Sequence, residues 1–258
     1  MPEGDTIHHA ANRIRPILLG GVPDEILTPH PRFGADRWPE RLAGREVVSV
    51  DAHGKHLFLR FEGDLTIHSH LRMTGSWGTY VAGARWRRSP RRAWLVLRAR
   101  GHEVVEFDGP VLELLTESRT RFDLRLQSLG PDICVSPFDS ERFVHRLRQD
   151  DPTRPIGDAL LDQRTVAGIG NIWKSEACWE ARVDPQRPAG RVTDDEARAL
   201  VDLVHPRMAA SARTGSGGRD ARAYGRDGRP CPRCRTPIRM ARLGDGNRTT
   251  YWCPGCQG

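Results

Sequence analysis

The sequence predicts an α+β protein built from several parts, and four observations lead to this prediction. The chain has 258 residues, enough for one large domain or a few small ones. Its first half contains short, alternating apolar segments separated by glycines, as in antiparallel sheets. After residue 130 the apolar residues recur at helical spacing instead. Four cysteines form two Cys-x-x-Cys pairs near the end of the chain.

The N-terminal part is expected to open with an amphipathic helix that begins at Thr6 and stops at Gly20-Gly21. The residues of its apolar face are Ile7, Ala10, Ala11, Ile14, Ile17 and Leu18. Five strand-like segments follow: Glu46 to Val50, His56 to Phe61, Leu65 to His70, Trp94 to Ala99, and Val104 to Asp108. We therefore expect residues 1–130 to form a domain in which a helix precedes an antiparallel β-sandwich.

The pattern changes at Gly130-Pro131-Asp132, and residues 131–210 are expected to form a helical domain. Helices are predicted at 139–149, after Pro155, at 171–182, and after Thr193, which begins a Thr-x-x-Glu capping box. Residues 211–228 are rich in glycine and arginine and lack periodicity, so we expect a basic linker there.

The cysteine pairs indicate a metal site in residues 229–258. The pairs Cys231/Cys234 and Cys253/Cys256 are separated by 18 residues, as in a four-cysteine zinc ribbon with one structural Zn²⁺. Between them, residues 239–252 predict a hairpin that turns at 244–247. Two disulfides are the alternative; it leaves Cys134 and Cys178 as free thiols and lacks a secretory signal to support it.

The charge balance indicates a polyanionic partner. Lys plus Arg is 40 against 33 for Asp plus Glu, which gives a net charge of +7. Nucleic acid is favoured over a membrane, since no apolar run approaches the roughly 18 residues of a membrane span. The acidic start of the chain lacks the apolar core of a signal peptide, so a cytoplasmic location is expected. Only two of the cations are lysine, Lys55 and Lys174.

The N-terminus could carry chemistry. Removal of Met1 would leave Pro2 with a secondary amine, which can attack an electrophilic carbon. Because the pKa of an α-amino group is near 8, this amine is neutral at pH 7 far more often than a lysine. Glu3 could move a proton at the same centre. The alternative interpretation is an ordinary solvated terminus.

Two further segments suit contact with phosphates. Gly168, Gly170 and Asn171 lie where a helix begins, and a turn there can offer backbone N–H groups to an anion. The alternative is a tight connection between helices without a ligand. The predicted hairpin carries arginines, among them Arg248, that could lie beside a phosphate or in a minor groove, unless they form only a solvated basic face.

Together, these features resemble the formamidopyrimidine-DNA glycosylase / endonuclease VIII family of base-excision repair enzymes. The similar segments are Pro2-Glu3-Gly-Asp-Thr6, Gly54-Lys55-His56-Leu57, Ser69-His70-Leu71-Arg72-Met73-Thr74-Gly75, Leu129-Gly130-Pro131-Asp132, Leu161-Asp162-Gln163 with Val166-Ala-Gly-Ile-Gly-Asn171, Tyr224-Gly225-Arg226 and the four-cysteine segment. Their order and spacing extend over nearly the whole chain.

The resemblance implies a helix and β-sandwich domain, a helix–two-turn–helix domain and a zinc finger, with damaged DNA as the partner. It also implies a DNA glycosylase with abasic-site lyase activity, in which Pro2 attacks C1′ and β- and δ-elimination follow. Glu3 would be the general acid/base, and Lys55 would contact the flanking phosphate.

The resemblance assigns further residues to DNA binding. Gly170 and Asn171 would grip a backbone phosphate through their turn. Arg248 would contact DNA near the lesion and assist δ-elimination, and Met73 with Arg72 would fill the gap left by the flipped base.

The start Glu3-Gly4-Asp5-Thr6 is similar to the endonuclease VIII branch, which favours oxidised pyrimidines as substrates. The stretch Phe107-Asp108-Gly109-Pro110 lacks the Asp-Pro-Arg-Arg-Phe-type motif of the branch that removes 8-oxoguanine. An enzyme of the formamidopyrimidine/8-oxoguanine type remains an alternative. Others are a catalytically silent protein that binds damaged DNA, and a zinc-ribbon RNA or protein adaptor. A monomer is expected.

Overall fold

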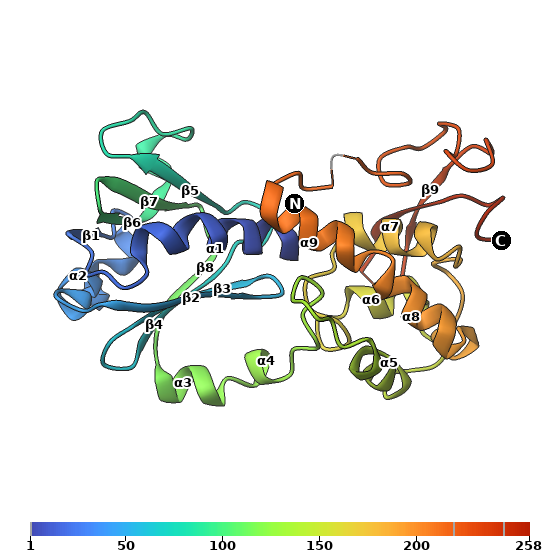
Figure 1. Cartoon of the computed structure of the whole chain (residues 1–258), viewed down its shortest axis with the longest axis horizontal. Helices are drawn as coiled ribbons and strands as arrows, with labels where there is room; N and C mark the ends of the chain where they lie inside the picture. Colours follow the sequence, from blue (N-terminus) through green and yellow to red (C-terminus); the bar gives the residue numbers. More distant parts are fainter. Residues whose placement is uncertain (1, 219, 245) are drawn as a thin grey trace. The chain divides into compact units, whose positions relative to one another are not determined.

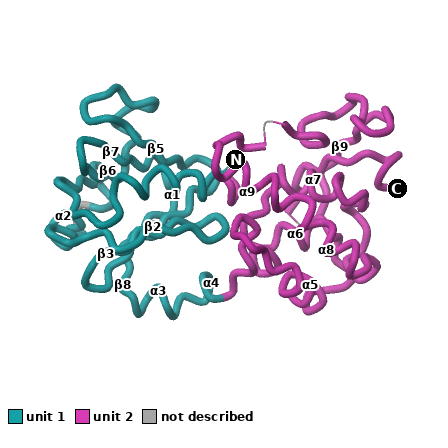
Figure 2. Tube along the Cα trace, viewed as in Figure 1, with its two compact units in different colours: residues 1–2, 6–127 teal, residues 3–5, 128–258 magenta. Residues whose placement is uncertain are grey.

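The computed structural model describes residues 2–218, 220–244 and 246–258. The chain forms two compact units, of which the first comprises residues 1–2 and 6–127 and the second residues 3–5 and 128–258 (Figure 2). The expected initiator Met1 lies outside the described residues. Within the described residues, no helix combines the length and the apolar character that a membrane span requires.

The first unit contains two four-stranded antiparallel sheets, which confirms the expected α+β class (Figure 1). One sheet has the order β2 (Val47–His53), β3 (His56–Phe61), β4 (Leu65–His70) and β8 (Val111–Thr116). The other has the order β1 (Glu25–Leu27), β6 (Ala93–Ala99), β7 (His102–Phe107) and β5 (Ser76–Val81).

Helix α1 (Gly4–Leu18) supplies the apolar face that its spacing predicts. Ile7, Ala11, Ile14 and Leu18 are buried in one core with residues from both sheets, such as Leu59, Ile67, Leu97 and Val104. The short elements around the sheets are η1 (Pro31–Asp36), α2 (Trp38–Leu42), η2 (Pro90–Arg92), α3 (Glu117–Phe122) and α4 (Leu124–Gln127).

Three strands were not predicted from the sequence. In β5 every residue from Ser76 to Tyr80 is only partly buried, so the strand lacks an apolar and polar alternation. Gly78 interrupts it further. β1 has three residues, too few for a pattern, and β8 begins directly after Gly109-Pro110, a pair typical of turns. Cross-strand pairing, rather than local sequence, makes these segments strands.

The second unit contains the expected helices: α5 (Ser140–Arg148), α6 (Ile156–Leu161), α7 (Asn171–Glu180) and α8 (Asp194–Asp202), with η3 (Ala189–Arg191) between the last two. Helix α9 (His205–Thr214) was not predicted, and it includes the first four residues of the expected linker. It ends at Gly215, whose φ of 73° suits the left-handed conformation of a helix C-cap.

The segment with the cysteine pairs forms the expected hairpin. β9 (Arg239–Leu243) pairs antiparallel with β10 (Arg248–Trp252), and the turn spans 244–247. Of the turn residues, Asp245 lies outside the described ones.

The start of α8 allows a test of local stability. The Thr193 hydroxyl accepts a bond from the Glu196 backbone N–H, and the Glu196 carboxylate accepts one from the Thr193 N–H. We expect Thr193→Ala to lower the free energy of unfolding by about 1 kcal/mol, measured by urea denaturation. Thr193→Ser keeps the hydroxyl and should retain most of the stability; equal losses in both variants would contradict the capping role.

Candidate active site and metal centre

The carboxylate of Glu3 caps helix α7 in the second unit. Oε2 accepts the backbone N–H groups of Gly170 at 2.9 Å and Trp173 at 3.3 Å, while Oε1 accepts that of Ile172 at 2.8 Å. The side chain is 1% exposed. A helix N-terminus stabilises a negative charge through these N–H groups, so Glu3 is held in one place and one orientation.

Gly170 has to be glycine because Glu3 lies so close. A Cβ atom at this position would lie 2.4 Å from the carboxyl carbon of Glu3. The sequence pattern predicted that this turn binds a phosphate of DNA, but the N–H of Gly170 already serves the protein's own carboxylate. The N–H of Gly170 therefore holds Glu3, and the contact of this turn with a phosphate stays a prediction.

The side chain of Asn171 also has a partner within the protein. Its Nδ2 donates to the carbonyl oxygen of Thr249 at 2.6 Å, and only 7% of the residue is exposed. Thr249 is in β10, next to Arg248. Asn171 thus ties the start of α7 to the strand that begins with Arg248, and it presents no exposed amide to a ligand.

More contacts continue this attachment along α7. Lys174 Nζ donates to Thr250 Oγ1 at 2.7 Å, and the Tyr251 backbone N–H donates to Ser175 Oγ at 3.4 Å. Burial lowers the pKa of Lys174 to about 8. Because residues three or four apart share one helix face, a single face of α7 carries β10.

Arg248 is the first residue of β10 and is exposed, opposite Leu243 across the hairpin. Its charge contributes to the lowered pKa of Lys174, after the larger effect of burial. The guanidinium therefore stands at the exposed end of a strand that α7 holds in place.

The four cysteines converge as the spacing predicted. The four sulfur atoms lie within 4.8 Å of one another, with 3.9 Å between Cys231 and Cys256 and 3.4 Å between Cys234 and Cys253. Tetrahedral zinc with Zn–S bonds of about 2.3 Å would place sulfurs roughly 3.8 Å apart. All six cysteines of the chain are free, so the disulfide alternative does not describe this structure. The residues fit one metal ion.

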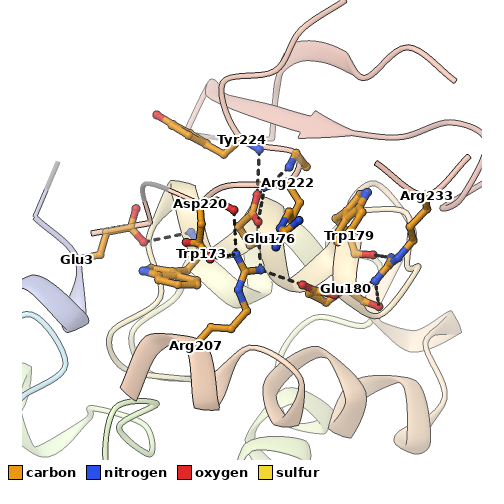
Figure 3. Close-up of polar contacts among 11 residues, drawn as sticks. Glu3, Trp173, Glu176, Trp179, Glu180, Arg207, Asp220, Arg222, Tyr224 and Arg233 are labelled. Atoms are coloured by element: carbon orange, nitrogen blue, oxygen red, sulfur yellow. Dashed lines mark hydrogen bonds and ion pairs between the residues drawn. The ribbon is translucent and has the colours of Figure 1, made fainter. Parts of the chain in front are cut away.

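The sequence analysis missed a polar cluster that fixes the segment before the cysteines (Figure 3). Glu176 is 0% exposed, and its carboxylate accepts the backbone N–H groups of Arg222, Ala223 and Tyr224 at 2.8 to 3.0 Å. Arg207 of α9 pairs with the same carboxylate at 3.2 Å. A glutamate between the tryptophans Trp173 and Trp179 of the predicted helix was the available signal, because a buried charge needs partners.

Trp179 connects α7 to the metal ligands. Its Nε1–H donates to Cys231 Sγ at 3.4 Å. The guanidinium of Arg233 stacks on the indole, 3.6 Å from the ring centroid, and pairs with Glu180 at 2.7 Å (Figure 3). Hydrogen bonds to metal ligands orient them, so α7 supports the cysteine cluster directly.

The remaining candidates lie in the first unit. Lys55 is in the tight turn between β2 and β3, beside Gly54, whose φ is 55°. Its charge, after burial and Arg72, contributes to lowering the pKa of His70 to about 4. The loop after β4 carries Arg72, whose φ is 48° and whose backbone N–H donates to His70 Nδ1 at 3.2 Å.

Met73 is next to Arg72 in this loop and is 62% exposed, which is unusual for a large apolar side chain. Pro2 borders a cavity of about 130 Å³ whose lining includes Leu71 and Gly75 at the two ends of the same loop. Within the first unit, Pro2 and the Met73 loop are therefore neighbours across a small cavity.

The sequence analysis also missed a chain of histidines beside Lys55. His56 Nδ1 lies 2.8 Å from His68 Nε2, and His68 Nδ1 lies 3.0 Å from a carboxylate oxygen of Glu113. Burial lowers the pKa of His56 to about 2 and also lowers that of His68. Both rings are therefore neutral at pH 7, and the bonds run in one direction: His56 donates to His68, and His68 donates to Glu113.

The capping of α7 generates a prediction for Glu3. Glu3→Gln places an amide N–H group opposite backbone N–H groups and leaves at least one buried donor without an acceptor. We expect a loss of about 1 to 3 kcal/mol in the free energy of unfolding, measured by urea denaturation. Glu62→Gln, at an exposed position, is the matched control. A Glu3→Gln variant as stable as this control would contradict the capping role.

The cysteine cluster generates a second prediction. Cys253→Ser should reduce the metal content from one ion per chain to well below one. Inductively coupled plasma mass spectrometry measures this content. Cys178→Ala, outside the cluster, should keep the full content. Retention of one tightly held ion by the Cys253 variant would show that the cluster is not the metal site.

Comparison with known proteins identifies the family. Residues 1–111 match the formamidopyrimidine-DNA glycosylase N-terminal domain, and residues 129–222 match the H2TH domain of the same glycosylase. "Probable endonuclease 8 2" of Streptomyces coelicolor is 42% identical and covers 100% of this chain and 94% of its own. "DNA-(apurinic or apyrimidinic site) lyase Nei2" of Mycolicibacterium smegmatis is 37% identical and covers 100% and 99%.

Solved structures agree on the fold. The Fpg protein of Lactococcus lactis, bound to DNA with an abasic site, superimposes with a TM-score of 0.84 over 99% of both chains, at 23% identity. This likeness concerns the fold alone, whereas the sequence matches reach across the whole chain. The chain therefore belongs to the formamidopyrimidine-DNA glycosylase family, among relatives that are named endonuclease 8.

Proposed function

We propose that this protein is a bifunctional DNA glycosylase and abasic-site lyase of base-excision repair. The observation that carries the proposal is the fixed carboxylate of Glu3, buried on three backbone N–H groups and covalently adjacent to Pro2. Removal of Met1 would make Pro2 a secondary amine on the residue that precedes Glu3 in the chain. Such an amine is a nucleophile at neutral pH.

The proposed reaction begins when the Pro2 nitrogen attacks C1′ of a damaged nucleotide. The new N–C1′ bond replaces the glycosidic bond, and the base leaves with its bonding electrons and a proton. The C1′–O4′ bond of the sugar then breaks, O4′ takes a proton, and a C1′=N iminium (the Schiff base) forms on Pro2. The iminium acidifies C2′, so loss of a C2′ proton expels the 3′ phosphate. A second elimination expels the 5′ phosphate, and water then releases the sugar fragment from Pro2. Glu3 is proposed to move protons at the sugar, and Lys55 to contact a flanking phosphate and assist elimination.

DNA binding is proposed for three exposed or partly exposed residues. Met73 and Arg72 lie in a constrained loop and would occupy the space of the flipped nucleotide. Arg248 would contact the backbone near the lesion. Gly170 and Asn171 are proposed to grip a backbone phosphate through their turn, in addition to the bonds by which they hold Glu3 and Thr249.

We propose that the cysteine cluster holds one structural Zn²⁺. The tetrathiolate donor set and the sulfur spacing suit this ion. Zinc would cross-link the two cysteine pairs and so keep the β9–β10 hairpin in place. The four-part division of the chain, at residues 130, 210 and 228, is part of this proposal, as are a monomeric enzyme and action on the chromosome in the bacterial cytoplasm.

Oxidised pyrimidines are the proposed substrates. Support comes from the relatives named endonuclease 8. It also comes from the turn 107–110, which lacks the Asp-Pro-Arg-Arg-Phe-type motif of the branch that removes 8-oxoguanine. The alternative is a formamidopyrimidine or 8-oxoguanine substrate. A relative from Thermus thermophilus named formamidopyrimidine-DNA glycosylase is 33% identical over this whole chain, which keeps that alternative relevant.

Borohydride trapping tests the proposed chemistry. With abasic-site DNA, wild-type protein should give a covalent adduct whose attachment maps to Pro2, because borohydride reduces the Schiff base. Pro2→Gly should form at least tenfold less adduct, and Glu3→Gln should slow elimination. Intact mass should show that Met1 is absent. Tight binding to the same DNA without any adduct would instead identify a silent DNA-binding protein.

Substrate choice can be tested separately with duplexes that carry one lesion each. We expect excision of thymine glycol to exceed that of 8-oxoguanine by at least tenfold in kcat/KM. The abasic site serves as the control, since its cleavage needs no base recognition. A preference for 8-oxoguanine would support the alternative substrate class and leave the lyase proposal intact.

A further inference from the structure

The loop between β5 and β6 in the first unit holds the densest group of arginines in the chain (Figure 1). Within the sequence Arg85-Trp-Arg-Arg-Ser-Pro-Arg-Arg92, six of eight residues carry a guanidinium or an indole. The site residues proposed above do not include any of them. The loop is therefore a feature that the glycosylase chemistry leaves unexplained.

Trp86 anchors this loop to the sheet. Its Nε1–H donates to the Glu103 carboxylate at 2.7 Å, and its ring lies 5.7 Å from that of Phe107. The backbone N–H of Arg87 donates to the hydroxyl of Tyr80 at 3.3 Å. Since the indole points inward, the residues on either side of it present their side chains outward from an anchored backbone.

Arg88 connects the loop to the segment that carries Met73. Its Nη1 donates to the carbonyl oxygen of Thr74 at 3.0 Å and pairs with Asp108 at 2.9 Å. Arg92 pairs with the same carboxylate at 2.6 Å. The arginine loop and the Met73 loop are thus held together through one guanidinium and one carboxylate.

The three other arginines of the loop have no carboxylate partner. Arg85, Arg87 and Arg91 are exposed, and none forms an ion pair with any residue in the described part of the chain. Nearby acidic groups do not neutralise the positive charges of these three arginines. Asp108 is paired twice, Glu103 binds Trp86 and Arg98, and burial raises the pKa of Glu106 to about 8, so it is mostly neutral at pH 7.

Two of these arginines, Arg85 and Arg87, border a groove. A depression of about 380 Å³ is lined by Arg13, Ser76, Trp77, Gly78, Thr79, Tyr80, Arg85, Arg87, Arg88 and Phe107. The cavity beside Pro2 shares Arg13, Ser76, Trp77 and Thr79 with it. A continuous, cationic surface of the first unit therefore extends from Pro2 to the arginine loop.

We propose that this groove and loop bind the phosphates of the damaged DNA strand beyond the nucleotide at Pro2. Guanidinium groups bind phosphate through paired N–H donors, and aromatic residues in the groove suit an adjacent base or sugar. The inference rests on the proposed function in one respect, because it takes damaged DNA as the ligand. The arginines lengthen the stretch of the DNA strand that the protein contacts, and they take no part in the chemistry.

The triple variant Arg85→Gln, Arg87→Gln, Arg91→Gln tests this proposal. The probe is a duplex with a tetrahydrofuran abasic-site analogue, and affinity is measured by fluorescence anisotropy from 50 to 200 mM salt. Loss of three phosphate contacts should reduce the slope of log K against log salt by 2 to 3 units. Wild-type protein should then lose about 40-fold more affinity over this range than the variant.

The matched control is Arg32→Gln, Arg119→Gln, Arg121→Gln, which removes three exposed arginines that lie outside both the groove and the β5–β6 loop. It should keep the wild-type slope, and a triple loop variant with the slope of this control would overturn the proposal. Thermal unfolding verifies that both variants fold. Borohydride adduct formation at saturating enzyme should be unchanged in the loop variant, so a failure of the Pro2 chemistry is seen in wild-type protein independently of the salt slope.

Discussion

The bonds between the Glu3 carboxylate and the first turn of α7 are the interaction on which the second unit's candidate site depends. A buried carboxylate without partners would be costly, and here three backbone N–H groups satisfy it. The same bonds satisfy donors that every helix leaves without partners at its N-terminus. One contact thus stabilises the helix and immobilises the group that is proposed to move protons. The glycine at position 170 is the steric condition for this approach.

Helix α7 also positions the segment that contains the four cysteines. Its polar residues Asn171 and Lys174 bind β10, and Trp179 reaches a cysteine ligand. Glu176 holds the chain segment that leads into the module. The N-terminus of α7 therefore binds the proposed acid/base, Glu3. Trp179, near the other end of the helix, contacts the cysteine cluster. Substitutions along α7 should therefore affect both the position of Glu3 and the cysteine cluster.

The arginines of the β5–β6 loop in the first unit differ from arginines elsewhere in the chain in their partners. Elsewhere in the chain, arginines such as Arg148, Arg154 and Arg198 pair with carboxylates and help to hold the fold together. In the β5–β6 loop, Arg85, Arg87 and Arg91 have no such partner among the described residues, which favours a polyanion from outside. Arg88 and Arg92 are the exceptions there, because both pair with Asp108, and Arg88 also joins the loop to the segment around Thr74.

Local sequence determined much of this protein. The capping box at Thr193, the cysteine pairs and the hairpin turn after Leu243 depend on residues close in sequence, whose geometry permits few arrangements. The glycines before α7 also indicated an anion, but the sequence could not show that the anion is Glu3, 167 residues from Gly170. Likewise β5, which lacks a pattern of its own, becomes a strand only by pairing with β7. Tertiary structure decided these features because their partners are distant in the chain, and a local pattern carries no information about which distant group satisfies a buried charge or a strand edge.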